Sequence, residues 1–466
     1  MAGERRPRSI RDLRDLRRWL RPGMGVKRWL VLVFVGLLAL GLGGAVFLRQ
    51  IARDASPSSP LAQFVDAVTF QFLPIDVRVP VLGLAGLVLV VVGSYRLIRA
   101  LMEPFRSFAD PDQPLVEVIY QKRFLSRGPK IVAIGGGTGL SALLRGLKEH
   151  TSNLTAVVTV ADDGGSSGVL REALGIPPVG DIRNCIVALA DAEPLMGDLL
   201  QYRFPPEGGS ASGASGSRED AGPDRLAGHA VGNLLIAAMT AIEGGDFEEG
   251  VRQVNRVLAV RGSVLPASPT PITLHARLAD GSVIVGQSLI ARTGGIAEVW
   301  ISPDDVHASD DALRAIAEAD AIVFGPGSLF TSILPSLLLP DIRAAVTSSS
   351  AVRVFVCNVA TQQAETSGFD LADHVAALER QTERGIADVV LANNQFRARV
   401  PGEWRGETVR LRWPHEPGPV PKLVLEDVVD PDNAHHHDPV RLAAAVLRTI
   451  EREAALRRRA RDARSA

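Results

Sequence analysis

The sequence contains only two cysteines and carries almost no net charge. Cys185 and Cys357 lie far apart among 466 residues, which excludes a disulfide framework or a cysteine-rich zinc site and favours a reducing compartment. The formal net charge of −1 removes the global electrostatic argument for a nucleic-acid partner, so we expect none. The length allows roughly two or three domains.

Long apolar runs are present, and two of them occupy the first hundred residues. The segment from Trp29 to Leu48 has twenty residues without a charge, and a second run extends from Val79 past Arg96 to Ile98. A helix that spans a bilayer needs about 20 apolar residues, so the sequence predicts a transmembrane hairpin over residues 29–98. The alternatives are a cleaved signal peptide for the first run and a buried soluble helix for the second.

Basic residues set the expected orientation of this hairpin. Residues 1–28 contain ten Arg and Lys residues, whereas the loop at 49–78 contains three. Because positive residues favour the cytoplasmic side, we expect both ends of the hairpin there, with the basic N-terminus close to anionic headgroups. The sequence therefore predicts a multi-pass protein of a bacterial inner membrane, with a linker at 99–129 followed by a cytoplasmic domain.

Residues 130–450 alternate apolar strands with helices. A strand, a helix and a second apolar strand form a βαβ unit with parallel strands. The repeated alternation predicts an α/β fold that is Rossmann-like, with a mostly parallel doubly wound sheet covered by helices on both faces. One expected helix, at 309–319, has Ser309 as its N-cap. The expected strands begin at Lys130 and then cover 155–163, 321–328, 352–358 and 387–394.

Two segments interrupt this alternation, and a basic helix ends it. Residues 207–225 are rich in Gly and Ser and predict a flexible loop. Residues 272–290 alternate apolar and polar side chains around an Asp-Gly pair, which predicts a hairpin and a small antiparallel addition to the sheet. A helix is expected to begin at Asp438-Pro439 and to run into a basic tail at 451–466.

The first candidate ligand-binding segment consists of Gly135, Gly136, Gly137, Thr138 and Gly139. Glycines between a strand and a helix let the backbone approach a phosphate, and the helix amides favour its negative charge. The segment is neither a complete dinucleotide fingerprint nor a P-loop, because a leucine stands at the third glycine position and no Gly-Lys-Ser/Thr follows. A tight packing turn is the alternative.

The second candidate segment follows the next strand and contains Asp162, Asp163, Ser166 and Ser167. Asp162 lies close to the position at which a dinucleotide fold places the acid that binds ribose. The adjacent carboxylates could also bind a divalent cation that bridges phosphate oxygens. An Asx turn that closes the strand is the alternative.

Two further segments carry polar residues suited to an anionic or sugar ligand. Asp181, Arg183 and Asn184 follow a double proline, and the planar guanidinium of Arg183 suits phosphate or carboxylate oxygens. A structural Asp–Arg pair is the alternative. His229 and Asn233 are four residues apart at the start of an expected helix, so one helix face could present both. A purely structural role for the histidine is equally open.

The last candidate segment repeats the design of the first, with a strand that enters a glycine turn. Two such turns could bind one diphosphate between them. The three histidines at 435–437 have no spaced partners and are expected in a solvated loop. The candidate residues of this last segment are Gly325, Gly327, Ser328, Phe330, Thr331, Ser332 and, after the next strand, Asn358.

Taken together, these motifs resemble one known family. They read, in order, GGGTGLSALLRGLKEH, VTVADDGGSSGVLRE, PPVGDIRNCIVALA, GHAVGNLLIAAMT, RGSVLP and GPGSLFTSILP. Their order and spacing over residues 130–450 resemble the YvcK/CofD-like family, and within it the YvcK branch of gluconeogenesis factors. The membrane hairpin and the Gly/Ser insertion depart from that pattern, but neither falls on a matched motif.

The resemblance implies a Rossmann-like fold and binding of UDP-N-acetylglucosamine. It also implies a role in cell shape, in peptidoglycan precursor supply and in growth on gluconeogenic carbon sources. Phe330 stands where the YvcK branch often has a tyrosine beside the nucleotide, so ring stacking could persist without the phenol hydrogen bond. The CofD branch transfers phospholactate with magnesium, and Asp162 and Asp163 match its acidic pair.

Three hypotheses follow. The first is a non-catalytic sensor of a nucleotide sugar that regulates a partner enzyme in amino-sugar or peptidoglycan synthesis, because no nucleophile–base pair stands out. The second is a phosphotransferase like 2-phospho-L-lactate transferase, with magnesium on Asp162 and Asp163. The third is an NAD(P)-dependent oxidoreductase, which the incomplete fingerprint disfavours. Magnesium is the one cofactor considered, and a homo-oligomer is left open.

Overall fold

The computed structural model describes residues 124–190, 194–205, 226–399, 406–413 and 421–465, together with isolated residues between 37 and 96. The expected basic N-terminus, the linker up to residue 123 and the Gly/Ser-rich loop lie outside the described residues. The chain divides into two compact units, Met1–Phe124 and Leu125–Ala466, and the description below concerns the second.

The expected transmembrane hairpin also lies almost entirely outside the described residues. The isolated residues that are described within its two runs are helical. Among the described residues, no single helix combines the length and the apolar character that crossing a membrane requires. Two helices meet both criteria only as a pair, Leu329–Leu337 with Pro340–Ser348, and they are bent by 78° relative to each other.

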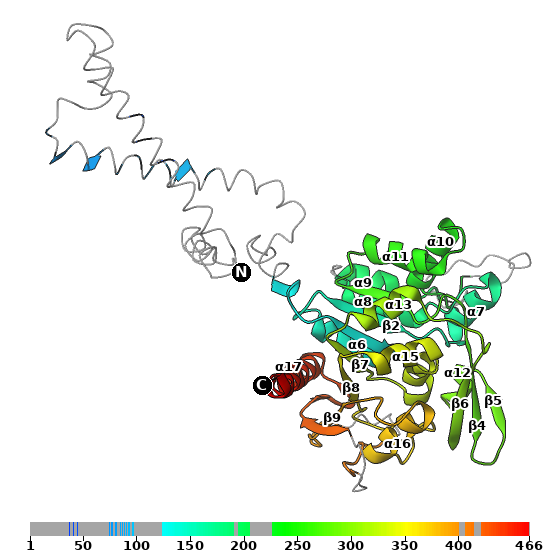
Figure 1. Ribbon diagram of the computed structural model, residues 1–466. Helices are drawn as coiled ribbons and strands as arrows, with labels where there is room; N and C mark the ends of the chain where they lie inside the picture. The colour runs from blue at the N-terminus through cyan, green and yellow to red at the C-terminus, as the bar shows by residue number, and fades with distance from the viewer. Residues whose placement is uncertain are drawn as a thin grey trace, which may run out of the picture. The chain divides into compact units, whose positions relative to one another are not determined.

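The second unit is built on a seven-stranded sheet in which all the paired strands are parallel. The strand order is β10-β9-β8-β7-β1-β2-β3 (Figure 1). This confirms the expected α/β class and parallel sheet, and each expected strand is present. The strands are β1 Ile131–Gly135, β2 Leu154–Val158, β3 Ser263–Pro266, β7 Ala321–Phe324, β8 Val352–Val356, β9 Val389–Asn393 and β10 Lys422–Glu426.

The connections make the sheet doubly wound around the junction of β1 and β7. From β1 the chain moves to β2 on one side, and from β7 it moves to β8 on the other. Right-handed crossovers therefore place the two sets of helices on opposite faces of the sheet. In such sheets ligands bind at the carboxyl ends of the strands, at the point where the strand order reverses. Here that point lies between β1 and β7.

Helices pack together in layers beside the sheet. One layer contains α6, α8 and α17, which contact one another through α6, and another contains α13, α14 and α15. The helices are α6 Gly137–Leu147, α7 Gly165–Leu174, α8 Gly180–Leu189, α9 Pro194–Gln201, α10 Val231–Ile242, α11 Phe247–Val257, α12 Gln287–Ile290, α13 Asp310–Ala317, the π-helix η2 Leu329–Ile333, α14 Leu334–Leu337, α15 Pro340–Ser348, α16 Leu371–Gln381 and α17 Pro439–Ser465.

Helix α6 shows how the sequence pattern positions the glycine turn. Its leucines at 140, 143, 144 and 147 recur at helical spacing, and all four side chains are fully buried. Each buried leucine stabilises the fold by roughly 1.5–3 kcal/mol. Because the leucines fix the helix against the sheet, the N-terminus of α6 is held directly after the carboxyl end of β1.

The expected hairpin at 272–290 is present as part of a separate sheet. Strands β4 (Thr273–Leu278) and β5 (Val283–Val285) are antiparallel, and β6 (Ile296–Ser302) pairs with the other side of β4. These three strands form their own sheet, which stands to one side of the parallel sheet (Figure 1). The expectation of an addition to the main sheet is corrected in this respect.

Both expected caps are confirmed, and the C-terminal helix is longer than expected. Ser309 accepts a hydrogen bond from the backbone of Ala312, and Asp438 accepts two at the start of α17. The basic residues expected to form a tail at 451–466 are helical up to Ser465. Helix α17 continues to Ser465, and Arg457 donates to Asp388 and to two backbone carbonyls of the loop before β8.

Two local expectations are corrected, and two strands were not predicted. Strand β2 ends at Val158, so the aspartate pair lies in a loop a few residues beyond the strand. Strands β3 and β10 at the sheet edges had no clear sequence signal. The three histidines are not in a solvated loop, because they belong to strand β12 (Asn433–His437), which pairs with β11 (Val429–Asp430). Burial of His437 lowers its pKa to about 4.

Candidate functional site

The two glycine turns meet at the junction of β1 and β7. A Cβ atom placed on Gly139 would lie 2.6 Å from the carbonyl oxygen of Pro326, and one placed on Gly327 would lie 3.2 Å from the carbonyl oxygen of Gly136. Only glycine permits this approach of one backbone to the other. The structure therefore brings together both glycine turns that the sequence singled out, at the carboxyl edge of the sheet.

The N-terminus of α6 already holds a carboxylate. Asp181, the second residue of α8, accepts a hydrogen bond from the backbone N–H of Gly137. Its Oδ2 atom lies so close to Gly136 that a Cβ there would clash with it. Burial and the negative charge of Asp162 raise the pKa of Asp181 to about 6. One of the four orphan amides of this helix terminus is thus satisfied internally.

The second turn is capped in the same way by a residue that the sequence did not reveal. Glu365 accepts hydrogen bonds from the backbone N–H of Phe330, at 2.8 Å, and from the hydroxyl of Thr331, at 3.1 Å. The carboxyl group is buried, and this burial raises its pKa to about 7. A buried carboxylate therefore holds the start of η2 in place.

Two amide side chains hold the rest of the second turn. Asn358, two residues after the end of β8, donates to the carbonyl of Gly327 at 2.8 Å and accepts from its N–H at 3.1 Å. Gln362 donates to the hydroxyl of Ser328 at 2.6 Å. Asn358 lies at the expected edge of the sheet, but its amide is engaged by the turn itself. In this structure Asn358 positions Gly327.

The adjacent aspartates point to different partners. Asp162 accepts from the N–H of Gly164 at 2.9 Å and from Ser167, and burial raises its pKa, with a further increase from Asp163. Asp163 is exposed and accepts from the N–H of Ser288 at 2.8 Å, at the start of α12. Among the described residues, no group of three or more His, Cys, Asp or Glu side chains is placed to hold a metal ion.

Residues from three sequence motifs form one buried chain of hydrogen bonds. Ser166 Oγ lies 3.0 Å from Nδ1 of His229 and accepts from Nδ2 of Asn233 at 2.9 Å. Asn233 Oδ1 accepts from Arg183 at 3.0 Å, and Arg183 also donates to Asn184 at 2.9 Å. The chain thus links the start of α7, the start of α8 and the start of α10 at the same edge.

Two expectations for this chain are corrected. His229 precedes the N-cap of α10, so it does not share a helix face with Asn233, and Ser166 joins the two instead. Arg183 donates to the two asparagines and does not form the alternative Asp–Arg pair. Burial, together with the charge of Arg203, lowers the pKa of Arg183, and its buried Nε atom has no hydrogen-bond partner within the part of the chain that the structure describes.

The remaining candidate residues differ in exposure. Thr138 is exposed in the first turn of α6, and Ser332 is buried beside Gly137. The ring of Phe330 is 2% exposed and packs edge-on against Phe369, with ring centroids 6.3 Å apart. Stacking of this ring on a base would therefore require it to leave a buried contact.

The residues that the sequence did not reveal share a recognisable position. Glu365 and Gln362 belong to the polar segment after β8, NVATQQAETSG, of which only Asn358 was singled out. Thr159 directly follows β2, and its buried hydroxyl has no hydrogen-bond partner among the described residues. A search for polar residues after β2 and β8, the strands next to β1 and β7, would have found all three.

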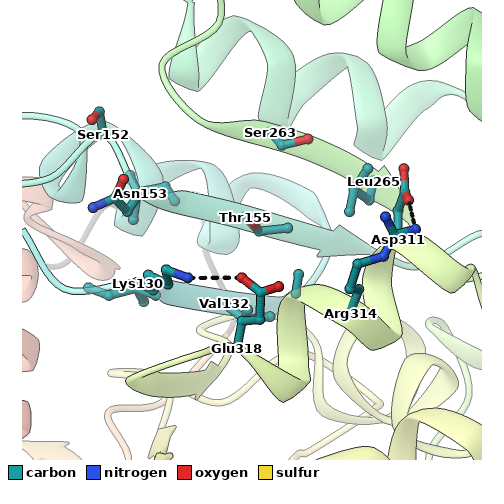
Figure 2. A pocket seen from close by; sticks show the side chains of 13 residues that line it. Lys130, Val132, Ser152, Asn153, Thr155, Ser263, Leu265, Asp311, Arg314 and Glu318 are labelled. Atoms are coloured by element: carbon teal, nitrogen blue, oxygen red, sulfur yellow. Dashed lines mark hydrogen bonds and ion pairs between the residues drawn. The ribbon is translucent and has the colours of Figure 1, made fainter. Parts of the chain in front are cut away.

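A pocket of about 390 Å³ lies elsewhere, at the opposite edge of the sheet. Figure 2 shows it at the amino ends of β1 and β2, beside α13, with the ion pair between Lys130 and Glu318 across it. Arg314 and Asp311 from α13 also line it and lie next to each other in Figure 2. Because the pocket contains none of the candidate residues, it is separate from the site at the carboxyl edge.

Comparisons with known proteins agree with this geometry. The family described as 2-phospho-L-lactate transferase CofD matches residues 131–406, which is more than half of the chain. A gluconeogenesis factor from Bacillus subtilis is 47% identical over 272 residues, covering 58% of this chain and 80% of that protein. A relative from Nostoc, whose description uses the same term, is 43% identical over 396 residues, covering 84% of this chain and 81% of the relative.

A solved structure shows the same fold. The crystal structure of a member of the UPF0052 family from Bacillus halodurans is similar with a TM-score of 0.60 and 39% identity, covering 69% of this chain and 99% of that one. The family match spans both glycine turns and the polar residues around them. The chain belongs to the CofD-like family, in the group of gluconeogenesis factors known as the YvcK family.

Proposed function

We propose that this protein binds a nucleotide sugar, UDP-N-acetylglucosamine, at the carboxyl edge of the sheet and acts as a regulator. Binding would control a partner enzyme of amino-sugar or peptidoglycan synthesis, and through it cell shape and growth on gluconeogenic carbon sources. The proposal includes anchoring to the bacterial inner membrane through the apolar runs within residues 29–98, with the ligand-binding domain in the cytoplasm.

The observation that carries the proposal is the convergence of five polar motifs at one point. The two glycine turns, the aspartate loop and the starts of α8 and α10 all meet beside the junction of β1 and β7. This is the position at which open parallel sheets bind nucleotides. Asp181 and Glu365, whose pKa values are raised by burial, also lie at this edge, and perturbed carboxyl groups of this kind are candidates for a functional site.

A second candidate is a phosphotransferase, which the match to the CofD family favours. The expected magnesium ligands do not fit this role as a pair, because Asp163 is directed to the backbone of α12 while Asp162 binds Gly164 and Ser167. The one serine–histidine contact at the edge, between Ser166 and His229, is part of the chain that Asn233 completes. These contacts support a binding role over catalysis.

Calorimetry on the full-length chain tests the proposal. UDP-N-acetylglucosamine, NAD and GTP are titrated separately, with and without magnesium, and we expect saturable binding of the nucleotide sugar without turnover. Asp162→Asn should weaken that binding about tenfold, because a charged acceptor beside the ligand is lost. Glu318→Gln, at the opposite edge of the sheet, is the matched control and should leave the affinity unchanged.

Each other outcome contradicts a defined part of the proposal. Magnesium-dependent release of a nucleoside monophosphate would establish the phosphotransferase instead. Saturable binding of NAD but not of the nucleotide sugar would overturn the assigned ligand and favour the oxidoreductase. An unchanged affinity in a folded Asp162→Asn variant would place the ligand away from the carboxyl edge.

A further inference from the structure

Two arginines lie beside the segment that leads into α10. Arg183, from the start of α8, is 7% exposed and packs against Gly232, where an added Cβ atom would lie 2.8 Å from the Cγ atom of the arginine. Arg203 follows α9 and is exposed, and its guanidinium donates to the backbone carbonyl of Gly228 at 2.9 Å. Residues 228–233 therefore bring a buried and an exposed arginine to the same end of α10.

Backbone pairing directs the side chain of Arg203 toward the protein. Two hydrogen bonds, of 3.1 and 3.0 Å, join residues 202–204 to residues 229–231, and Arg203 stands opposite Ala230 in an antiparallel bridge. Residues directly opposite each other in an antiparallel pair point to the same side. Because Ala230 is fully buried, that side is the interior side of the segment. The exposed guanidinium of Arg203 is thus attached on the side of the segment that faces the fold.

Neither guanidinium forms an ion pair within the described part of the chain. Arg183 donates to the side-chain oxygens of Asn233 and Asn184, at 3.0 and 2.9 Å, and both amides are neutral. Arg203 donates to a carbonyl, which is neutral as well. A buried charge is normally paired with an opposite charge, because desolvation of an isolated ion costs free energy. Arg183 is therefore a buried cation that the described residues leave without an ion-pair partner.

The two arginines also act on each other. Burial and, after it, the positive charge of Arg203 lower the pKa of Arg183, whereas the negative charges of Asp181 and Asp162 raise it. Arg203 is thus the charged group that acts most strongly on Arg183, ahead of either acid. Like charges held near each other raise the free energy of the protein, and an anion bound beside both of them offsets that cost. The pair of arginines therefore favours a ligand that carries negative charge.

We propose that Arg203 binds the diphosphate of the nucleotide sugar, and that the buried charge of Arg183 strengthens this binding. The planar fork of a guanidinium can form two parallel hydrogen bonds with phosphate oxygens, and the exposed Arg203 is accessible to a ligand. Arg183 has its donors on the two asparagines and contributes charge without a contact. This inference rests on the proposed function, because it assigns the charged part of the ligand to one residue.

The arginine pair belongs to the edge at which the sequence motifs meet. Asn233 accepts from Arg183 and also donates to Ser166, just after the aspartate loop, at 2.9 Å. The motifs of the sequence include Arg183 and Asn233 but not Arg203, which stands between α9 and the Gly/Ser-rich segment in no glycine turn. Arg203 is thus a further candidate ligand residue, which the pairing of residues 202–204 with the start of α10 brings to this edge.

The test measures the calorimetric affinity of the full-length protein for UDP-N-acetylglucosamine and for inorganic pyrophosphate. Arg203→Gln removes the charge but keeps an amide that can donate to the carbonyl of Gly228. Both probes should bind about tenfold more weakly, because a charge-assisted hydrogen bond to phosphate is lost. Arg203→Lys keeps the charge without the fork, so its affinities should lie between those of the unmodified protein and the glutamine variant.

The thermal midpoint without ligand separates a binding role from a structural one. Removal of a like charge near Arg183 offsets the loss of one exposed hydrogen bond, so the midpoint of Arg203→Gln should not fall. Arg256→Gln on α11 is the matched control, because this exposed arginine also donates to a neutral acceptor, Gln253, at 3.4 Å, and α11 packs against α10. It should leave both affinities unchanged.

The outcomes separate this inference from the proposed function. Unchanged affinities in a folded Arg203→Gln variant would overturn the inference, as would equal losses in Arg256→Gln, or weaker binding together with a lower midpoint. If the unmodified protein binds pyrophosphate but not the nucleotide sugar, the proposed function fails, and the pyrophosphate affinities alone decide the inference. If only the nucleotide sugar binds, its affinities for the three proteins decide it, and binding of neither probe contradicts both proposals.

Discussion

Carboxylate side chains lie in opposite electrostatic environments at the two edges of the parallel sheet. At the carboxyl edge, the carboxylates of Asp181 and Glu365 are bound to backbone amides of helix termini, and burial raises the pKa of each. At the amino edge, Lys130 and Glu318 form an ion pair of 2.9 Å with side chains that are 55% and 60% exposed. Hydrogen bonding to Lys130 lowers the pKa of Glu318.

The opposite signs of these pKa shifts reflect the different solvation of the carboxylates at the two edges. A solvated pair keeps its charge and contributes little to stability. A buried carboxylate disfavours its own charged form, so its position costs free energy that the fold must offset elsewhere. Clustered groups of that kind make the carboxyl edge the candidate functional site. The pocket of about 390 Å³ lies at the amino edge, whereas the carboxyl groups with raised pKa values lie at the carboxyl edge.

Among the substitutions considered, Gly139→Ala should destabilise the fold most. The added Cβ would lie 2.6 Å from the carbonyl oxygen of Pro326, and this contact is with backbone that no side-chain rotation can relieve. The two turns would have to separate, and overpacking of this kind costs about 3 kcal/mol. Urea unfolding of the variant should show that loss, together with loss of ligand binding.

Gly197→Ala is the matched control for this substitution. Gly197 also lies within a helix, α9, but the nearest atom to its added Cβ is 3.8 Å away, in ordinary contact with Val187. Alanine there should raise stability by about 0.5–1 kcal/mol, because glycine is the poorer helix former. Equal losses of stability from both substitutions would mean that the close contact between the two turns does not explain the effect of Gly139→Ala.

The difference in unfolding free energy between the unmodified protein and Glu365→Gln should depend on pH. The folded state raises the pKa of Glu365 from its ordinary value of 4.5 to about 7, so its contribution to stability is present at low pH and is lost as the pH rises through 7. Relative to the glutamine variant, the unmodified protein should lose on the order of 2 kcal/mol between pH 5 and pH 8. Chemical denaturation of both proteins at several pH values measures this difference.

The amino edge again provides the control. The pKa of Glu318 is lowered by Lys130, so this carboxylate stays ionised between pH 5 and pH 8. The stability difference between the unmodified protein and Glu318→Gln should therefore stay constant over that range. A constant difference for Glu365→Gln as well would mean that burial does not raise the pKa of this carboxyl group.

The part of the fold that local sequence patterns determine was predictable. The leucines of α6 recur at helical spacing, Ser309 and Asp438 cap the helices that follow them, and the Asp-Gly pair lies in the hairpin turn. The two glycine turns were predictable as a pair for a topological reason. Both follow apolar strands, and parallel strands end at the same edge of a sheet.

The internal partners of those turns were not predictable from local patterns. Glu365 is 35 residues from Phe330, and Asp181 is more than forty from Gly137, so only the assembled sheet brings them together. The adjacent aspartates looked like a pair because they are neighbours in sequence, yet successive residues of a loop can face different elements. Edge strand β10 lacked the continuous burial of a central strand, and its sequence pattern was correspondingly weak.

Lys130→Met should change stability and ligand affinity least, and it tests the amino edge of the sheet. Methionine keeps most of the apolar stem, and the backbone of Lys130 retains its hydrogen bonds with Asp320 and Ala321. Only the exposed ion pair with Glu318 is lost, and pairs of this kind are solvated and screened by salt. The thermal midpoint and the ligand affinity should both stay within experimental error. A loss that approaches the effect of Gly139→Ala would show that the amino edge also supports the fold, and that burial does not distinguish the two edges.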